Sequence, residues 1–290
     1  MLRHHATTAL PALVDRRGLL GIALLCAACS DGAVAGDGNL DLAVGSDAAA
    51  SADLGDGGAA YPYTLSAPSP SFKVSWGSGK LDCSMTAAAM AQSGAASVTF
   101  GQSTIYVGWS QVSGNNQDPF IARVSGGSIA FCLAAEAQAP DGRAYGVAWD
   151  GGSLLYAVYT VDGGGSAFDG KGGWLPAYGS IGSGGGPTVS VLAKHDPVSG
   201  AIQRATFIPA QLASTGKVNT LSPRGFTVTS DGSIEFLGVP SFSPLNPDKS
   251  RMCVSGPEYP SGYLVRFPAD LSTPTCAQTE SCSQVKTRCR

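Results

Sequence analysis

The chain has 290 residues, a formal net charge of −3, 13% charged and 43% hydrophobic residues, and 39 glycines. The low charge excludes a long coiled coil, and the apolar content excludes a chain that is disordered throughout. The net negative charge lies in residues 31–60 and the chain after them is nearly neutral, so we expect no basic face that would attract nucleic acid.

The N-terminal residues have the pattern of an export signal. Arg16 and Arg17 precede a short apolar stretch, 18–25, and small residues follow it up to Cys29. A positive segment, a short apolar stretch and small residues before the cleavage point are typical of a secretory signal. The apolar stretch is shorter than the ~20 residues that a membrane-spanning helix needs.

The sequence Ala27-Ala28-Cys29 resembles the end of a bacterial lipoprotein signal, in which the cysteine receives lipid and becomes the new N-terminus. Cys26 stands where that family usually has Leu, and it fits less well as the acylated residue because Leu25 before it is bulky. The resemblance implies a signal peptide over 1–28 and a lipid anchor on Cys29 in the cell envelope, on its periplasmic or cell-surface side. The alternative is an ordinary cleaved signal. The arginine pair also resembles a twin-arginine export signal.

Residues 29–60 predict a flexible tether. Between 31 and 60 the chain has six Asp, no Lys or Arg, and mostly Gly, Ala and Ser otherwise. Such a segment cannot bury enough apolar surface to offset its ordering entropy, and its like charges repel. Residues 37–45 resemble part of the calcium loop of integrin-type repeats, but Ala33 and Ala35 stand where further carboxylates are needed, which favours the tether.

An even number of cysteines remains after Cys29. They are Cys83, Cys132, Cys253, Cys276, Cys282 and Cys289. In an exported chain this predicts up to three disulfides, whose pairing the sequence leaves open. Four of the six lie within 253–289, so we expect a stapled C-terminal end. Their spacing lacks the CxxC pairs of zinc sites, and no metal site is predicted.

The body of the chain, 61–290, repeats one pattern three times. Each repeat has a first hairpin with an aromatic residue at a matched place and then a second hairpin. The first hairpins are 97–110, 147–160 and 227–240, with Tyr106, Tyr156 and Phe236, and the second hairpins are 120–132, 191–203 and 263–271. The segment 72–83 resembles a further copy of the second hairpin. Two hairpins in each repeat predict four-stranded antiparallel units.

Residues 145–150, 154–160 and 191–200 resemble the repeats of bacterial β-propellers. The resemblance implies an all-β fold, a β-propeller-like array of four-stranded blades, about four to five in number. Three full units and a leading half fall short of a closed ring, so hidden strands complete the ring or the array is open. A β-sandwich is the alternative.

Two long insertions hold the candidate binding residues. The first, 162–187, is rich in glycine, and the second spans 241–261. Both interrupt the same link of their repeat, so we expect them on one face, and long loops on a rigid scaffold often bind ligands. The candidates are Phe168, Lys171, Trp174 and Tyr178 in the first and Arg251 and Tyr259 in the second. Aromatic rings there suit sugars or peptides, or alternatively cover the blade edge.

His195 is the one histidine after the signal, and Val124 and Phe267 occupy its matched places. An apolar position predicts a packed ring rather than a catalytic base. Residues 165–172 nearly match a phosphate loop, but Gly172 replaces the Ser or Thr that holds magnesium, which excludes that site. The matched cations Arg123, Lys194 and Arg266 could face an anionic ligand or solvent.

Together these patterns predict a lipid-anchored protein of the cell envelope that acts as a non-catalytic binding or scaffold module for a protein or glycan. The alternative is a propeller-type enzyme, either a quinone-dependent sugar dehydrogenase or a polysaccharide-cleaving enzyme. The sequence assigns no catalytic residue, and no cofactor is predicted. The expected partners are the membrane, through the lipid, and the unknown ligand, but not nucleic acid.

Overall fold

The computed structural model describes residues 62–114, 116–134, 141–162, 166–177, 186–254 and 260–289. All of them belong to one compact unit, Ser46–Arg290. The signal peptide predicted over 1–28, the lipidation site Cys29 and the tether over 29–60 lie outside the described residues.

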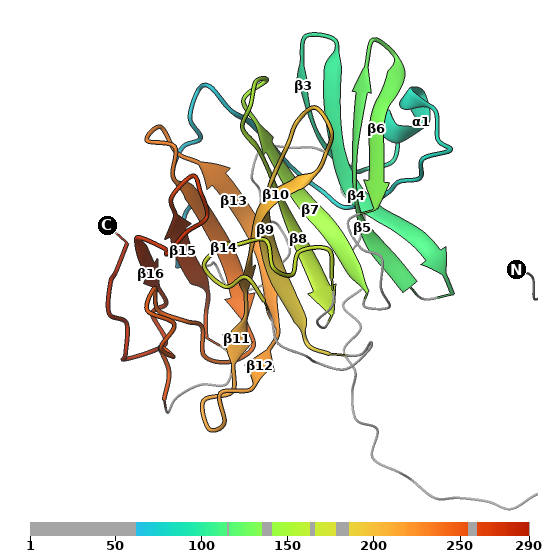
Figure 1. Cartoon of the computed structure of the whole chain (residues 1–290). Helices are drawn as coiled ribbons and strands as arrows, with labels where there is room; N and C mark the ends of the chain where they lie inside the picture. The colour runs from blue at the N-terminus through green and yellow to red at the C-terminus, as the bar shows by residue number, and fades with distance from the viewer. Residues whose placement is uncertain are drawn as a thin grey trace, which may run out of the picture. The chain divides into compact units, whose positions relative to one another are not determined.

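Three antiparallel meanders of four strands each form the body, and the strands of each meander follow one another in chain order (Figure 1). The first contains β3 (Ala96–Phe100), β4 (Ser103–Ser113), β5 (Asn116–Ser125) and β6 (Ser128–Ala134). The second contains β7 (Gly142–Trp149), β8 (Leu155–Asp162), β9 (Thr188–His195) and β10 (Ile202–Ile208). The third contains β13 (Leu221–Val228), β14 (Ile234–Pro240), β15 (Tyr263–Phe267) and β16 (Cys276–Gln278). The all-β class and the predicted pairs of hairpins are therefore confirmed.

Short polar residues form the turns of the first hairpins. The carboxylate of Asp150 accepts the backbone N–H groups of Gly152 and Leu154 at 2.8 and 3.0 Å. Asp231 accepts the N–H of Ser233 at 2.9 Å in the third meander. An Asp side chain that bonds the backbone two to four residues ahead reverses the chain locally, which explains why Asp-Gly pairs separate the strands in this sequence.

The segment 72–83 corrects one prediction, because it is not a hairpin. Its strands diverge: β1 (Lys73–Trp76) pairs antiparallel with β7, and β2 (Gly79–Lys80) pairs parallel with β4. The reason is close backbone approach, since a Cβ placed on Gly108 of β4 would lie 2.1 Å from the carbonyl oxygen of Gly79. Two small elements complete the described chain: α1 (Ala87–Ala91) and the hairpin of β11 (Ala210–Gln211) and β12 (Val218–Asn219).

The meanders stack face to face, and the second is buried on both sides. Along β8, Leu155, Ala157 and Tyr159 pack against the first meander, whereas Tyr156 and Val158 pack against the third. All five side chains are fully buried. Alternation along a strand sends successive side chains to opposite faces, so an uninterrupted apolar strand such as β8 requires a layer on each side.

All three meanders stack in the same sense. The third strand of each meander shows this at one matched place, which pairs with the second strand. The pairs are Val124 with Thr104, His195 with Leu155, and Phe267 with Ile234. Two positions further along the second strands stand Tyr106, Ala157 and Phe236, so these three residues are equivalent. The prediction that Tyr156 is the equivalent residue of the second meander was wrong by one position. The cause is the longer turn before β8, which starts at Leu155, two residues after Ser153, whereas β14 starts directly after Ser233.

The two outer faces of the stack are covered by other parts of the chain. Leu81 and Met90 pack against Tyr106 and Phe120 on the outer face of the first meander. The disulfide between Cys83 and Cys132 links this covering segment to β6. Residues 62–69 cross the outer face of the third meander. Terminal units of a stacked array need such covers because their outer faces have no neighbouring unit.

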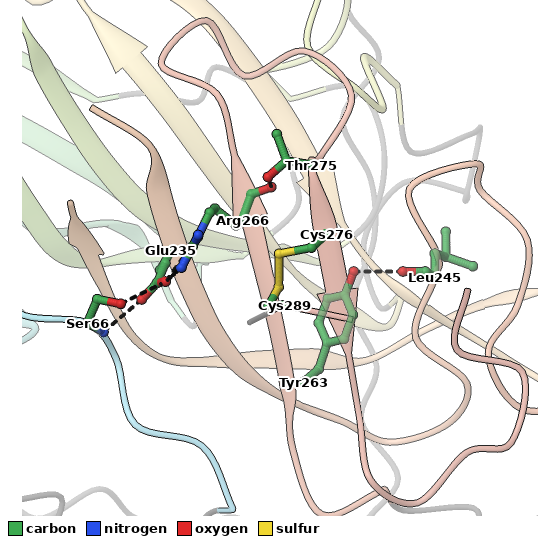
Figure 2. Close-up of a disulfide and its surroundings, with 8 residues drawn as sticks. All are labelled: Ser66, Glu235, Leu245, Tyr263, Arg266, Thr275, Cys276 and Cys289. Atoms are coloured by element: carbon green, nitrogen blue, oxygen red, sulfur yellow. Dashed lines mark hydrogen bonds and ion pairs between the residues drawn. A yellow bond between two sulfur atoms is a disulfide. The ribbon is translucent and has the colours of Figure 1, made fainter. Parts of the chain in front are cut away.

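Glu235 marks the end of the stack, and Figure 2 shows its contacts. It occupies the place that Ile105 and Tyr156 fill in the other meanders, and only 2% of its surface is exposed. Ser66 donates to its carboxylate through N at 2.7 Å and Oγ at 3.0 Å, and Arg266 forms an ion pair with it. A buried charge is tolerated when it is paired and hydrogen-bonded in this way.

The described sheets remain open. One parallel pair, Leu221 of β13 with Val189 of β9, also links the second and third meanders, which with β1 gives a nine-stranded sheet, while the first meander and β2 form a five-stranded one. None of the described sheets closes into a barrel or a propeller. A closed ring of about four to five blades is therefore not found among these residues.

Candidate functional site

The first insertion follows the outer edge of β10. Gly173 N–H donates to the carbonyl of Ala205 at 3.0 Å, and Phe207 N–H donates to that of Leu175 at 3.0 Å. A Cβ on Gly173 would lie 2.3 Å from the Ala205 oxygen, so glycine is what allows the insertion to lie this close. The backbone groups of the edge strand are thereby paired, as a sheet edge requires.

Both described aromatic residues of this insertion are buried. Phe168 is fully buried with its ring centroid 4.9 Å from that of Tyr159. Trp174 is 4% exposed and packs at 6.0 Å, in an edge contact, against Phe267. Their rings therefore stabilise the interior and do not offer a face to a ligand, which is the alternative that the sequence left open. Tyr178, at the other end of this insertion, lies outside the described residues.

Trp174 also joins the two insertions. Its indole N–H donates to the carbonyl of Pro247 in the second insertion at 2.8 Å. The second insertion is held to the sheet by Tyr263, whose hydroxyl donates to the carbonyl of Leu245 at 2.8 Å (Figure 2). The two insertions thus meet, as their matched positions in the repeats predicted.

Asn246 connects the second insertion to the C-terminal segment. Its amide Nδ2 donates to the carbonyl of Gln284 at 2.9 Å, and its Oδ1 accepts the backbone N–H of Lys286 at 2.9 Å. The side chain is fully buried, so these bonds are shielded from water. The disulfide between Cys253 and Cys282 links the same two segments, and Cys276 pairs with Cys289 nearby.

A cavity of about 390 Å³ lies over this junction, which we name the cap cavity. Its lining comes from three segments: β11, the second insertion and the C-terminal segment after β16. The lining residues are Gln211, Lys249, Ser250, Arg251, Val254, Gln284 and Lys286. Its volume is within the range of about 300–1,000 Å³ that small-molecule sites occupy.

Three of the seven lining residues carry positive charge, and none is acidic. Arg251 is oriented by its Nη1, which donates to the carbonyls of Leu212 at 3.0 Å and of Ala213. Lys286 forms an ion pair at 2.5 Å with Asp248, beside the cavity. That hydrogen bond, with further bonds from Ser250, lowers the pKa of Asp248 to about 2, so the carboxylate stays ionised.

Lys249 adopts a left-handed backbone conformation with φ of 68°. Its backbone N–H closes a turn to the carbonyl of Asn246 at 2.8 Å. A side chain in this region costs about 1 kcal/mol relative to glycine, so the chain retains a lysine where glycine would be more stable. Its ammonium has no hydrogen-bond or ion-pair partner within the described part of the chain, which leaves a free positive charge at the cavity.

Of the predicted binding residues, the structure brings only Arg251 to the cap cavity among those it describes. Lys171 is exposed on the first insertion and does not line the cavity. Tyr259 lies outside the described residues. Sequence reasoning named Lys249 within the second insertion but missed Asn246 and Lys286, because the proximity of these two depends on the disulfide pairing and on contacts across about forty positions.

The matched cations elsewhere have other contacts. Arg123 donates to the carbonyl of Pro197 at 2.7 Å and lies over the ring of Trp149. Arg266 is paired with Glu235. These two side chains therefore serve packing within the stack. Lys194 is half-buried on β9 and does not line the cap cavity.

His195 is fully buried, as its apolar matched positions predicted. Its Nε2 lies 2.9 Å from the hydroxyl of Tyr159 and its Nδ1 lies 2.9 Å from the carbonyl oxygen of Gly200. Burial lowers its pKa from 6.5 to about 4, so the ring is neutral at physiological pH. The histidine thus packs and bonds in the interior, away from the cap cavity.

All six cysteines that were expected to pair do so, as Cys83–Cys132, Cys253–Cys282 and Cys276–Cys289. Three disulfides indicate an oxidising location outside the cytoplasm. Among the described residues no three metal-ligating side chains lie close enough to hold an ion, and no helix there is long and apolar enough to span a bilayer. Comparisons with protein-family models, with curated proteins and with solved structures find no match to this chain.

Proposed function

We propose that this protein is a lipid-anchored binding module of the bacterial cell envelope that recognises its ligand at the cap cavity. One observation carries the proposal: the second insertion, supported by Trp174 of the first, and the C-terminal segment are fixed together by Asn246 and two disulfides around one open cavity. Rigid scaffolds that hold irregular loops in this way commonly serve binding.

The position of the chain in the cell supports this role. The disulfides agree with export, and the sequence up to Cys29 resembles a lipoprotein signal. A lipid anchor followed by a self-repelling tether of about thirty residues would hold the body away from the membrane surface while limiting its escape. A binding module at the envelope benefits from this arrangement because its ligand is captured at the cell.

We further propose that the three meanders are propeller-type blades in an open array. The same face of each meander, the one that bears Tyr106, Ala157 or Phe236, points toward the preceding unit or its cover. In a propeller, the front face of one blade packs against the back face of the next, as it does here. In a sandwich whose equivalent faces pack against each other, every second meander would have the opposite orientation. The sandwich is the alternative, and an experimental structure in which Tyr106 faced the second meander would favour it.

Substitution of Cys29 tests the anchor. Full-length protein expressed in a Gram-negative host should be found in the membrane fraction, with an N-terminal peptide whose mass includes acyl chains. Cys29→Ala should release the protein or block its processing, and Cys26→Ala should leave attachment unchanged because Leu25 before it is bulky. An N-terminal peptide of the parent protein without acyl mass, or membrane attachment of C29A after its signal has been cleaved, would overturn the anchor.

A further inference from the structure

The geometry points to an acidic saccharide as the ligand of the cap cavity, with a sugar carboxylate held by Lys249 and Arg251. This inference rests on the proposed binding function and names its ligand class. Three features of the lining support it: the charge, the neutral polar groups around it and the side chains that are free to bind.

The charge of the lining selects an anion. Lys249, Arg251 and Lys286 line the cavity, and the adjacent Asp248 neutralises Lys286 alone. Lys249 and Arg251 therefore leave about two uncompensated positive charges on one wall. Hydrogen bonds between a cation and an anion such as a carboxylate are about twice as strong as those between neutral groups, so an anionic ligand group is favoured over a neutral one.

The neutral lining suits hydroxyl groups. Gln211 and Gln284 line the cavity and carry side-chain amides, whereas the hydroxyl of the third neutral polar residue, Ser250, is bonded to Asp248 and Asn246. Amides both donate and accept, which matches the hydroxyl groups of a sugar ring. The described lining has no aromatic ring, so the stacking that commonly binds a neutral sugar face is not provided there. A saccharide that carries carboxylates uses both parts of the lining.

The free nitrogens of Arg251 are already oriented. Arg251 has one guanidinium nitrogen fixed on the carbonyls of Leu212 and Ala213, which limits the positions of its other two nitrogens before any ligand arrives. The turn to Asn246 fixes the backbone of Lys249, while its ammonium stays on a mobile side chain. Preorganised groups lose less entropy on binding than mobile ones, which raises affinity.

Calorimetry with the full-length protein in detergent at low ionic strength tests the inference. The probe is an oligogalacturonate, and the controls are the same oligomer after reduction of its carboxyl groups, and inorganic phosphate. We expect binding of the oligogalacturonate that weakens as salt rises, because salt screens exposed charges. Equal binding of the reduced oligomer would overturn the role of the carboxylate, and binding of phosphate without the uronate would overturn the saccharide.

Two variants locate the binding. Lys249→Gly removes the ammonium and suits the left-handed backbone, so the fold should be preserved while affinity falls at least about fivefold. Lys171→Ala removes an exposed lysine outside the cavity and should leave affinity unchanged. Unchanged affinity in K249G, or an equal loss in K171A, would place binding elsewhere. If the parent protein did not bind the uronate but remained attached to the membrane, the proposed ligand would be refuted and the proposed anchor would not.

Discussion

The indole N–H of Trp174 donates to the carbonyl oxygen of Pro247 at 2.8 Å, across 73 positions of the chain. This bond joins an insertion of the second meander to an insertion of the third. It lies beneath the segment that carries Lys249 and Arg251. The buried side chain of Trp174, which the sequence offered either as a binding residue or as a cover of the blade edge, supports the residues that line the cavity.

Trp174→Phe should loosen this support. Phenylalanine keeps an aromatic contact with Phe267 but leaves the Pro247 carbonyl without its donor, which should cost about 1–2 kcal/mol of unfolding free energy. Hydrogen exchange should show faster exchange at the backbone N–H groups of Asn246 and Lys249. The control is Trp109→Phe in β4 of the first meander, at a ring that contacts Arg143 of β7. This variant should leave those amides protected. Unchanged exchange in W174F would contradict the supporting role.

His195 should make stability depend on pH. Its folded pKa of about 4 lies below the ordinary 6.5, so between these values the unfolded chain binds the proton that the folded chain rejects. The contribution of the neutral His195 to the free energy of unfolding is therefore complete above pH 6.5. It is lost as the pH falls toward 4, a change of about 3 kcal/mol. Urea unfolding at a series of pH values measures it.

A paired substitution isolates this effect. In the double variant Tyr159→Phe and His195→Phe, the hydroxyl that bonds the histidine is removed together with the ring, and the carbonyl of Gly200 loses its partner equally at every pH. We expect a smaller loss of stability between pH 6.5 and 4 than in the parent protein. An equally steep loss in the double variant would show that other groups determine the acid sensitivity.

Arg266→Met should destabilise the end of the stack. It leaves the buried Glu235 carboxylate with Ser66 alone, and removal of one partner from a buried ion pair costs about 3 kcal/mol or more at pH 7. Arg204→Ala removes an ion pair with Asp270 that is exposed on both sides and should cost less than about 1 kcal/mol.

The double variant Glu235→Leu and Arg266→Met completes the cycle. Leucine restores the apolar character that Ile105 and Tyr156 have at the matched places, so the double variant should be more stable than R266M alone. Thermal unfolding of the parent protein, R266M, E235L and the double variant gives the coupling free energy between the two residues. Equal stabilities of R266M and the double variant would mean that the buried charge carries no penalty.

The sequence predicted the parts of this fold that depend on local patterns. Alternating apolar residues and Asp-Gly turns identified the hairpins, and the apolar places matched with His195 identified its buried role. The face of Tyr156 was misassigned because one extra turn residue moves every later side chain of the strand to the opposite face. The divergence of the segment 72–83 depends on the contact of Gly79 with Gly108, which no local pattern indicates.

The cap cavity could be predicted only in part. The matched positions of the insertions indicated that they lie together, and Arg251 was among the candidates. The roles of Asn246 and Lys286 depend on the pairing of Cys253 with Cys282, which an even count of cysteines does not determine. Composition likewise did not separate buried from exposed aromatic residues, since Trp174 stands in a glycine-rich segment that resembles a surface loop.

A crystal structure of the protein soaked with a galacturonate oligomer would test the account most directly. We predict a sugar carboxylate within hydrogen-bond distance of the Lys249 ammonium, with sugar hydroxyls near the amides of Gln211 and Gln284. An oligomer bound at another surface, or an empty cap cavity at saturating concentration, would contradict the assignment of this cavity as the binding site.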